Sequence, residues 1–193
     1  QEYSRNLMTV RIAQDIGLKK ILKLSEELDI YKDIPELLSV SLGSAETNLL
    51  SLTSAYATFA NGGKKVSPIL IDRIQDRRGK TIFNSDNREC VRCDRLLEQS
   101  DEFPGIKDNY KQVISKETAY QITSILEGVI SRGTGKKLRD LNVPLAGKTG
   151  TTNNNFDAWF IGFSSNLVVG VYVGFDSPKS LGKYETGSKA ALP

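Results

Sequence analysis

The sequence predicts an α/β domain of the α+β sandwich kind, in which helices pack on an antiparallel sheet. Three observations predict this class. Apolar residues recur at helical spacing through the first third of the chain, a further helical pattern precedes residue 133, and the segments after residue 144 have the composition of strands. With 39% hydrophobic and 25% charged positions among 193 residues, the composition is that of an ordinary globular domain.

The first two predicted helices cover residues 8–16 and 21–28, and Gly17 interrupts the apolar pattern between them. Thr47 has a side chain suited to a helix N-cap, and the apolar residues from 49 to 60 then recur on one helical face. Asn61-Gly62-Gly63 is expected to end this third helix.

A fourth helix is predicted after Ser115, its expected cap, and Gly133-Thr134-Gly135 is expected to end it. Strands are predicted over 145–152, 158–163 and 167–175, the last two joined by a short polar turn. The final segment is almost wholly apolar, which predicts a strand covered on both faces.

Between the third and fourth helices the chain is predicted to leave the core. Residues 66–74 and 81–83 flank the turn residues Asp76-Arg77-Arg78-Gly79 and predict a hairpin. Residues 84–109 are polar, charged and without a period, so we expect a surface insert there.

Charge and residue usage exclude several function classes. Lysine and arginine total 26 against 23 aspartate and glutamate, and this net charge of +3 is too small to predict a nucleic-acid partner. The chain has no histidine, which excludes Ser-His-Asp triads, Cys-His nucleophiles and His-ligated metals. Catalysis must therefore use lysine, carboxylate or hydroxyl groups, and we expect no metal or other cofactor. No apolar run approaches the roughly 20 residues of a membrane span.

The most informative segment runs from Ala146 to Thr152, a lysine between glycines followed by hydroxyls. Strand alternation places Lys148 and Gly150 on one face and Thr149 and Thr151 on the other. On an edge strand, such a segment could pair with an extended peptide and meet its terminal carboxylate, with Gly150 allowing close approach. It is not a Walker A loop, because strands rather than a helix follow. The alternative is a solvated lysine in a turn.

Several segments, in order, resemble the class A (bifunctional, 1A-type) penicillin-binding proteins. Ser4-Arg5-Asn6 matches their S-x-N element and Lys148-Thr149-Gly150 their K-T-G element, 144 residues later. The resemblance extends to Ser54–Gly63, Gly133–Gly135 and Asp157–Asp176, and leaves out only the insert at about 84–109. It implies the β-lactamase/transpeptidase-like fold.

The resemblance also implies serine acyl transfer through an ester intermediate, from a peptidoglycan stem peptide ending in D-Ala-D-Ala. Ser4 would pass a proton to the departing amine, and Asn6 would bind the acyl-side amide of the substrate. Lys148 would add positive potential. β-Lactam antibiotics would acylate the same site.

The substrate-binding residues implied by the resemblance follow the lysine along its strand. Thr149 and Thr151 would hold the donor carboxylate, beside Gly150. The backbone N–H of Thr151 would form half of the oxyanion hole. Thr152 is adjacent and has a weaker claim.

One departure from the family is large, because the S-x-x-K motif with the nucleophile should precede S-x-N. The Ser-Lys pairs at 115–116, 131–137, 177–179 and 188–189 all have other spacings. We therefore expect residues 1–193 to be the C-terminal part of a transpeptidase domain, inactive alone and completed by a companion chain that carries the upstream part.

By the same resemblance, the parent would be anchored in the cytoplasmic membrane, face the periplasm and carry a glycosyltransferase domain. Two alternatives stay open. A D,D-carboxypeptidase or β-lactamase would hydrolyse the acyl-enzyme, and a penicillin-binding receptor or scaffold would not turn over.

Cys90 and Cys93 lie in the insert, and three interpretations are open. An oxidising envelope compartment favours a local disulfide over free or cross-domain thiols. A redox or metal site ranks last, because the insert lacks the strand-to-helix setting of a thioredoxin-like motif, and no other cysteine or histidine could complete a zinc site.

Overall fold

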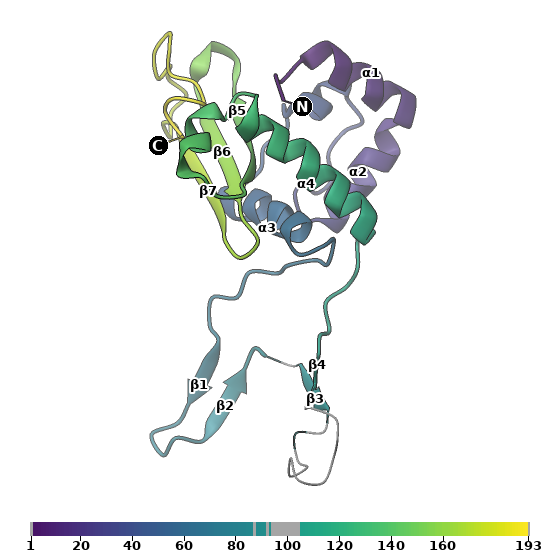
Figure 1. Cartoon of the computed structure of the whole chain (residues 1–193), viewed down its shortest axis with the longest axis vertical. Helices are drawn as coiled ribbons and strands as arrows, with labels where there is room; N and C mark the ends of the chain where they lie inside the picture. Colours follow the sequence, from purple (N-terminus) through teal and green to yellow (C-terminus); the bar gives the residue numbers. More distant parts are fainter. Residues whose placement is uncertain (1, 87, 92, 94–104, 193) are drawn as a thin grey trace. The chain divides into compact units, whose positions relative to one another are not determined.

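The computed structural model describes residues 2–86, 88–91, 93 and 105–192. The chain forms two compact units, which Figure 1 traces along the sequence. The first unit comprises Gln1–Val66 with Gln112–Pro193, and the second comprises Ser67–Lys111. The second unit thus contains the predicted insert at 84–109 and the predicted hairpin before it.

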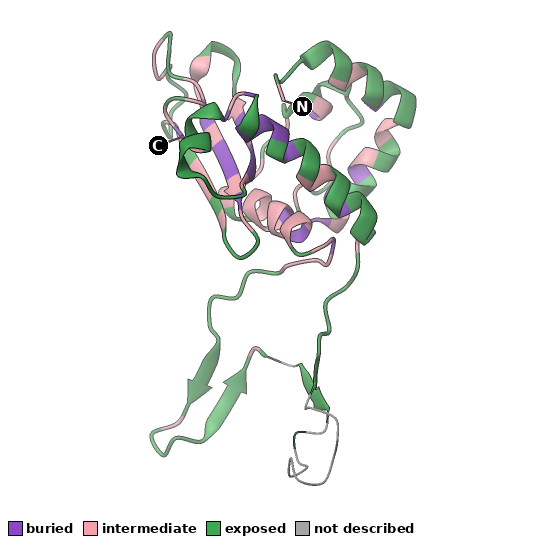
Figure 2. Ribbon diagram, in the orientation of Figure 1, coloured by how far each residue is buried: buried purple, intermediate pink, exposed green. Residues whose placement is uncertain are grey.

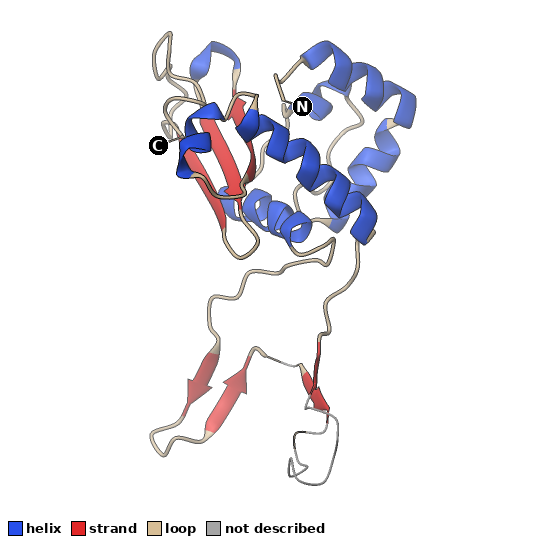
Figure 3. Ribbon diagram, in the orientation of Figure 1, coloured by secondary structure: helices blue, strands red, loops and turns tan. Residues whose placement is uncertain are grey.

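Four α-helices of the first unit follow the sequence pattern, and Figure 3 shows them with the sheet of this unit. They are α1 (Asn6–Ile16), α2 (Leu18–Glu27), α3 (Leu49–Ala60) and α4 (Lys116–Ser131), with 3₁₀ turns over Leu38–Leu42, Lys136–Leu141 and Asn153–Asn155. Gly17 separates α1 from α2 with a φ of +90°, a backbone conformation that glycine adopts at little cost. Among the described residues, no helix combines the length and apolar composition of a membrane span.

The two predicted helix caps have different outcomes. Ser115 caps α4 as predicted, because its side chain accepts a hydrogen bond from the N–H of Thr118. The predicted Thr47 cap of α3 is wrong. Asn48 caps this helix by accepting from the N–H of Ser51, while the Thr47 hydroxyl donates to the Ile30 carbonyl. Either side chain is suited to capping, and the hydrogen bond to Ile30 engages Thr47 elsewhere.

The sheet of the first unit has three antiparallel strands in the order β5 (Ala146–Thr151), β6 (Ala158–Phe163) and β7 (Val168–Val173). The strand predictions agree to within two residues at each end. The prediction that the last strand is covered on both faces is wrong, because no residue of β7 is buried. Within the described chain, β7 is an edge strand that pairs only with β6, and Val169 and Tyr172 are more than 40% exposed.

The apolar core of the first unit lies around β6 and α4, where Figure 2 shows the buried residues. One cluster joins Phe160 and Ala158 to Leu192 near the C-terminus, and another joins Phe163 to Val129 of α4. Phe160 and Phe163 therefore pack in the core. The Trp159 ring is half-buried and lies 4.7 Å, centroid to centroid, from the Tyr172 ring.

The Phe160 ring lies over a pair of glycines that face each other across the sheet. Gly147 of β5 pairs with Gly162 of β6. A Cβ atom at Gly162 would come within 2.7 Å of the Phe160 ring, and one at Gly147 within 3.1 Å. The ring therefore occupies the space that side chains would fill at these two positions.

The described residues of the second unit form two short hairpins. β1 (Arg73–Gln75) pairs with β2 (Thr81–Asn84), and β3 (Glu89–Val91) pairs with β4 (Gly105–Lys107). The first hairpin is shorter than predicted, since residues 66–72 form no strand. All residues of these four strands are exposed, so β-branched composition there does not reflect burial.

Candidate active site

Two residues that are 144 positions apart meet in the first unit. The ammonium nitrogen of Lys148 donates a hydrogen bond to the Ser4 hydroxyl at 2.5 Å and another to the Thr149 carbonyl at 2.6 Å. Burial lowers the pKa of Lys148 from its ordinary value, because the charged form loses hydration. A lysine so placed has two fixed acceptors and a reduced preference for its charged form, which suits it to exchange a proton with a neighbouring hydroxyl.

The segment that carries Ser4 is attached to the C-terminal end of α4. The Glu2 carboxylate pairs with the Arg132 guanidinium through both of its oxygens, and the Glu2 carbonyl accepts from the N–H of Thr134 at 3.2 Å. Ser4 has a left-handed φ of +51°, which is uncommon for a serine. The position of the Ser4 hydroxyl thus depends on contacts with a helix far along the sequence.

The three threonines after Lys148 have different partners. The Thr149 hydroxyl is buried and lies 2.7 Å from the Thr134 hydroxyl. The Thr151 hydroxyl accepts from the N–H of Gly187 at 3.0 Å, and the Thr152 hydroxyl accepts from the N–H of Asp157 at 2.8 Å. Thr152 therefore stabilises the turn between β5 and β6.

The glycine that allows a close backbone approach to β5 is Gly187, in a later segment of this same chain, whereas a Cβ atom at Gly150 would meet the Trp159 side chain at 3.1 Å. A Cβ atom at the buried Gly187 would lie 2.2 Å from the Gly150 carbonyl oxygen and 3.0 Å from the Gly150 nitrogen. Only a residue without a side chain fits there. Nothing in the sequence pattern around Gly187 indicated this contact.

Among the described residues, Asn6 is not hydrogen-bonded through its side chain to the other predicted site residues. Asn6 is the exposed first residue of α1. Within the described part of the chain, its side chain makes no hydrogen bond to Ser4 or Lys148.

The sequence contains one Ser-x-x-Lys run, Ser180-Leu181-Gly182-Lys183, which is not among the Ser-Lys pairs named above. The Ser180 hydroxyl donates to the Asn154 carbonyl at 2.9 Å and accepts from the N–H of Gly182 at 3.2 Å. The run lies in a loop after the sheet, rather than at a helix start before Ser4. Its hydroxyl is engaged locally, so it does not supply the family's nucleophile motif.

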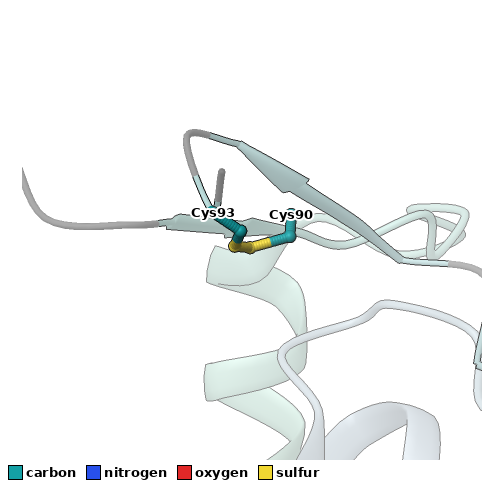
Figure 4. Close-up of a disulfide and its surroundings, with 2 residues drawn as sticks. All are labelled: Cys90 and Cys93. Carbon is teal, nitrogen blue, oxygen red and sulfur yellow. A yellow bond between two sulfur atoms is a disulfide. The ribbon is translucent and has the colours of Figure 1, made fainter. Parts of the chain in front are cut away.

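Cys90 and Cys93 are joined by a disulfide in the second unit, with a Cα–Cα distance of 5.7 Å (Figure 4). Cys90 belongs to β3 and pairs with Ile106 across the hairpin. The two cysteines are three positions apart in the sequence, so the bond closes a very short loop. Both cysteines belong to the second unit, whereas Ser4 and Lys148 belong to the first.

A cleft of about 620 Å³ in the first unit contains none of the predicted site residues. Its lining comes from the segment between Asp29 and Ser51. Cleft size therefore does not identify the site, whereas the hydrogen bonds of Lys148 do.

An antiparallel sheet covered by helices, with a Lys-Thr-Gly strand at its edge and a serine held against the lysine, is the arrangement of penicillin-recognising domains. The model of the penicillin-binding protein transpeptidase domain matches residues 1–192. The chain belongs to this transpeptidase family.

The relatives to which the chain is similar include penicillin-binding proteins of the 1A type. The chain is 48% identical to penicillin-binding protein 1A of Rickettsia typhi and 33% identical to that of Pseudomonas aeruginosa. These alignments cover 100% and 98% of the chain but 25% and 27% of the relatives. The crystal structure of penicillin-binding protein 1A from Haemophilus influenzae superposes with a TM-score of 0.80 at 30% identity, covering 97% of this chain and 31% of that one. The chain thus spans about a quarter of the length of these curated relatives.

Proposed function

We propose that this domain performs the D,D-transpeptidation step of peptidoglycan synthesis as part of a bifunctional class A penicillin-binding protein. The single observation that carries the proposal is the 2.5 Å hydrogen bond from Lys148 to Ser4. Membership of the transpeptidase family supports the same reaction. The parent protein is proposed to be anchored in the cytoplasmic membrane, with this domain on the periplasmic side.

In the proposed reaction, a serine hydroxyl attacks the carbonyl carbon of the penultimate D-alanine in a stem peptide ending in D-Ala-D-Ala. An ester forms, the C–N bond to the last D-alanine breaks, and an acceptor amine then takes the acyl group and restores the serine. The attacking serine would give its proton to the lysine of its own S-x-x-K motif, and Ser4 would pass a proton to the departing amine nitrogen and be reprotonated through Lys148. β-Lactams would form the same kind of ester.

The carboxylate of the donor would be bound by the hydroxyls of Thr149 and Thr151, opposite the positive charge of Lys148. The N–H of Thr151 would donate to the oxyanion, a contact whose removal costs roughly 3 to 4 kcal/mol in enzymes of this kind. Asn6 is proposed to bind the substrate's acyl-side amide, and its exposed side chain is accessible for that role.

The attacking serine is proposed to come from an S-x-x-K segment outside residues 1–193, on the same polypeptide or on a companion chain. Two observations support this. The family places that motif before S-x-N. The chain also spans only about a quarter of its curated relatives, which leaves room for the motif in a longer parent.

The test is the intact mass of the full-length protein after incubation with benzylpenicillin. We expect one penicilloyl group on the wild type. Ser4→Ala should slow cross-linking of a stem peptide about 10²- to 10⁴-fold, the usual range for a lost acid–base group. Ser41→Ala is the matched control, because the Ser41 hydroxyl donates to the Leu38 carbonyl at 2.6 Å, in a 3₁₀ turn of the same unit.

Product analysis distinguishes the alternatives. Cross-linked peptide supports transpeptidation, and hydrolysed donor alone would indicate a carboxypeptidase or β-lactamase. Adduct without turnover would indicate a receptor. A wild type without any adduct would contradict the proposal.

A further inference from the structure

Thr134 lies between the two segments that form the candidate active site. Its N–H donates to the carbonyl of Glu2, two residues before Ser4, at 3.2 Å. Its hydroxyl lies 2.7 Å from the hydroxyl of Thr149, the residue next to Lys148. One residue therefore contacts both the Ser4 segment and the Lys-Thr-Gly strand.

The backbone around Thr134 is held by short-range contacts. The N–H groups of Gly133 and Gly135 both donate to the carbonyl of Val129, at 3.1 and 2.9 Å. A Cβ atom at Gly133 would come within 2.5 Å of the Glu2 carbonyl oxygen. Gly133 thus allows the Ser4 segment to approach the end of α4, and the hydrogen bonds of Gly133 and Gly135 fix the backbone on either side of Thr134.

The hydroxyl pair restricts what Thr149 can do. A threonine hydroxyl has one proton to donate and can accept in addition. If the Thr134 hydroxyl donates to Thr149, the proton of the Thr149 hydroxyl is directed away from Thr134 and is available for an anionic group. Thr149 is only 9% exposed, so a hydroxyl that lost its partner there would be costly.

We propose that Thr134 is a positioning residue for acylation, which orients the Thr149 hydroxyl toward the donor's carboxylate while its N–H holds the Ser4 segment. This inference rests on the proposed function. It adds to that function a residue from outside the S-x-N and K-T-G elements.

The experiment compares three variants of the full-length protein with the wild type. Thr134→Val keeps the shape and the N–H but removes the hydroxyl, and Thr134→Ser restores the hydroxyl. Thr123→Val is the matched control, because Thr123 is on α4, the helix that ends just before Thr134, and its half-buried hydroxyl donates to the Ala119 carbonyl at 2.9 Å. The second-order acylation rate is measured with benzylpenicillin and with its methyl ester, which lacks the negative charge.

We expect Thr134→Val to acylate about tenfold more slowly with benzylpenicillin, with a smaller loss for the ester, so that the preference for the free acid falls. Thr134→Ser and Thr123→Val should stay within about twofold of the wild type. A merely structural role would slow both ligands equally. If the melting temperature shows that Thr134→Val is unfolded, Thr134→Ala replaces it in the same comparison.

Two results would overturn the inference with the proposed function intact: wild-type rates in Thr134→Val, or equal losses for both ligands. A wild type that forms no adduct overturns the proposed function itself. The two failures are therefore distinguishable.

Discussion

The two compact units of this chain are stabilised in different ways. In the first unit, buried side chains from helices and strands far apart in the sequence pack together, and the candidate site lies there. In the described part of the second unit, no residue is buried, and the strands are three or four residues long. A core fixes the backbones of segments far apart in the sequence, such as those that carry Ser4 and Lys148, so the chemistry should depend on the first unit.

The largest test of this comparison is one substitution made in both units. Phe160→Ala in β6 should lower the free energy of unfolding by about 3 to 5 kcal/mol, because Phe160 is 4% exposed in the core. Phe83→Ala in β2 should change the free energy of unfolding by no more than about 0.5 kcal/mol, since that residue is 47% exposed. Thermal unfolding of the full-length protein provides the measurement. Equal losses would mean that the second unit has a core of its own.

A smaller effect should appear at alkaline pH in the first unit. The half-buried Tyr56 packs against Phe59 and Phe163, and burial raises its pKa to about 12. The folded state keeps this proton, while the unfolded state loses it near pH 10. The contribution of Tyr56 to the free energy of unfolding is therefore fully present below pH 10 and is lost as pH rises toward 12. The loss should be on the order of 2 kcal/mol.

Tyr56→Phe removes that titration, so urea unfolding between pH 9 and 12 should show a shallower decline in the variant. Tyr120→Phe is the matched control, because Tyr120 of α4 is 75% exposed and the substitution removes a hydroxyl that is not buried. An unchanged slope in Tyr56→Phe would contradict the prediction.

The smallest effect is expected at Cys90 and Cys93. A double Cys→Ser variant should keep its acylation rate within about twofold, and its stability should change little because the disulfide closes only a short loop. Mass after alkylation should show no added group without reductant and two after reduction. Two groups without reductant would exclude the disulfide, and a large loss of acylation would connect the second unit to the chemistry.

The helices and the strands of the first unit were predictable because their signals are local. The apolar period, the Ser115 cap and the turn residues specify each element within its own segment. The burial of β7 was not predictable in this way, since an apolar strand has the same composition whether a neighbour lies beside it or not. Asn48 rather than Thr47 caps α3, and the Thr47 hydroxyl is bonded to the carbonyl of Ile30, 17 residues away, which no local pattern reveals.

The candidate site divides along the same line. The motifs indicated Ser4, Lys148 and Thr149 because short runs of fixed spacing are visible in one sequence. The contacts of Thr134 and Gly187 join segments 132 and 36 residues apart through a backbone N–H, which any residue but proline provides. No composition or period reveals which N–H is used.

The two facing glycines under the Phe160 ring determine more than packing. If β5 slipped along β6 by two residues, Thr149 or Leu145 would replace Gly147 beneath the ring, and its side chain would clash with the ring. Ala146 and Lys148 would not take that place, because their side chains lie on the other face of the sheet. The two glycines therefore specify the register of β5 against β6. It keeps Lys148 opposite Ile161, and so sets how far along the edge the ammonium group meets Ser4.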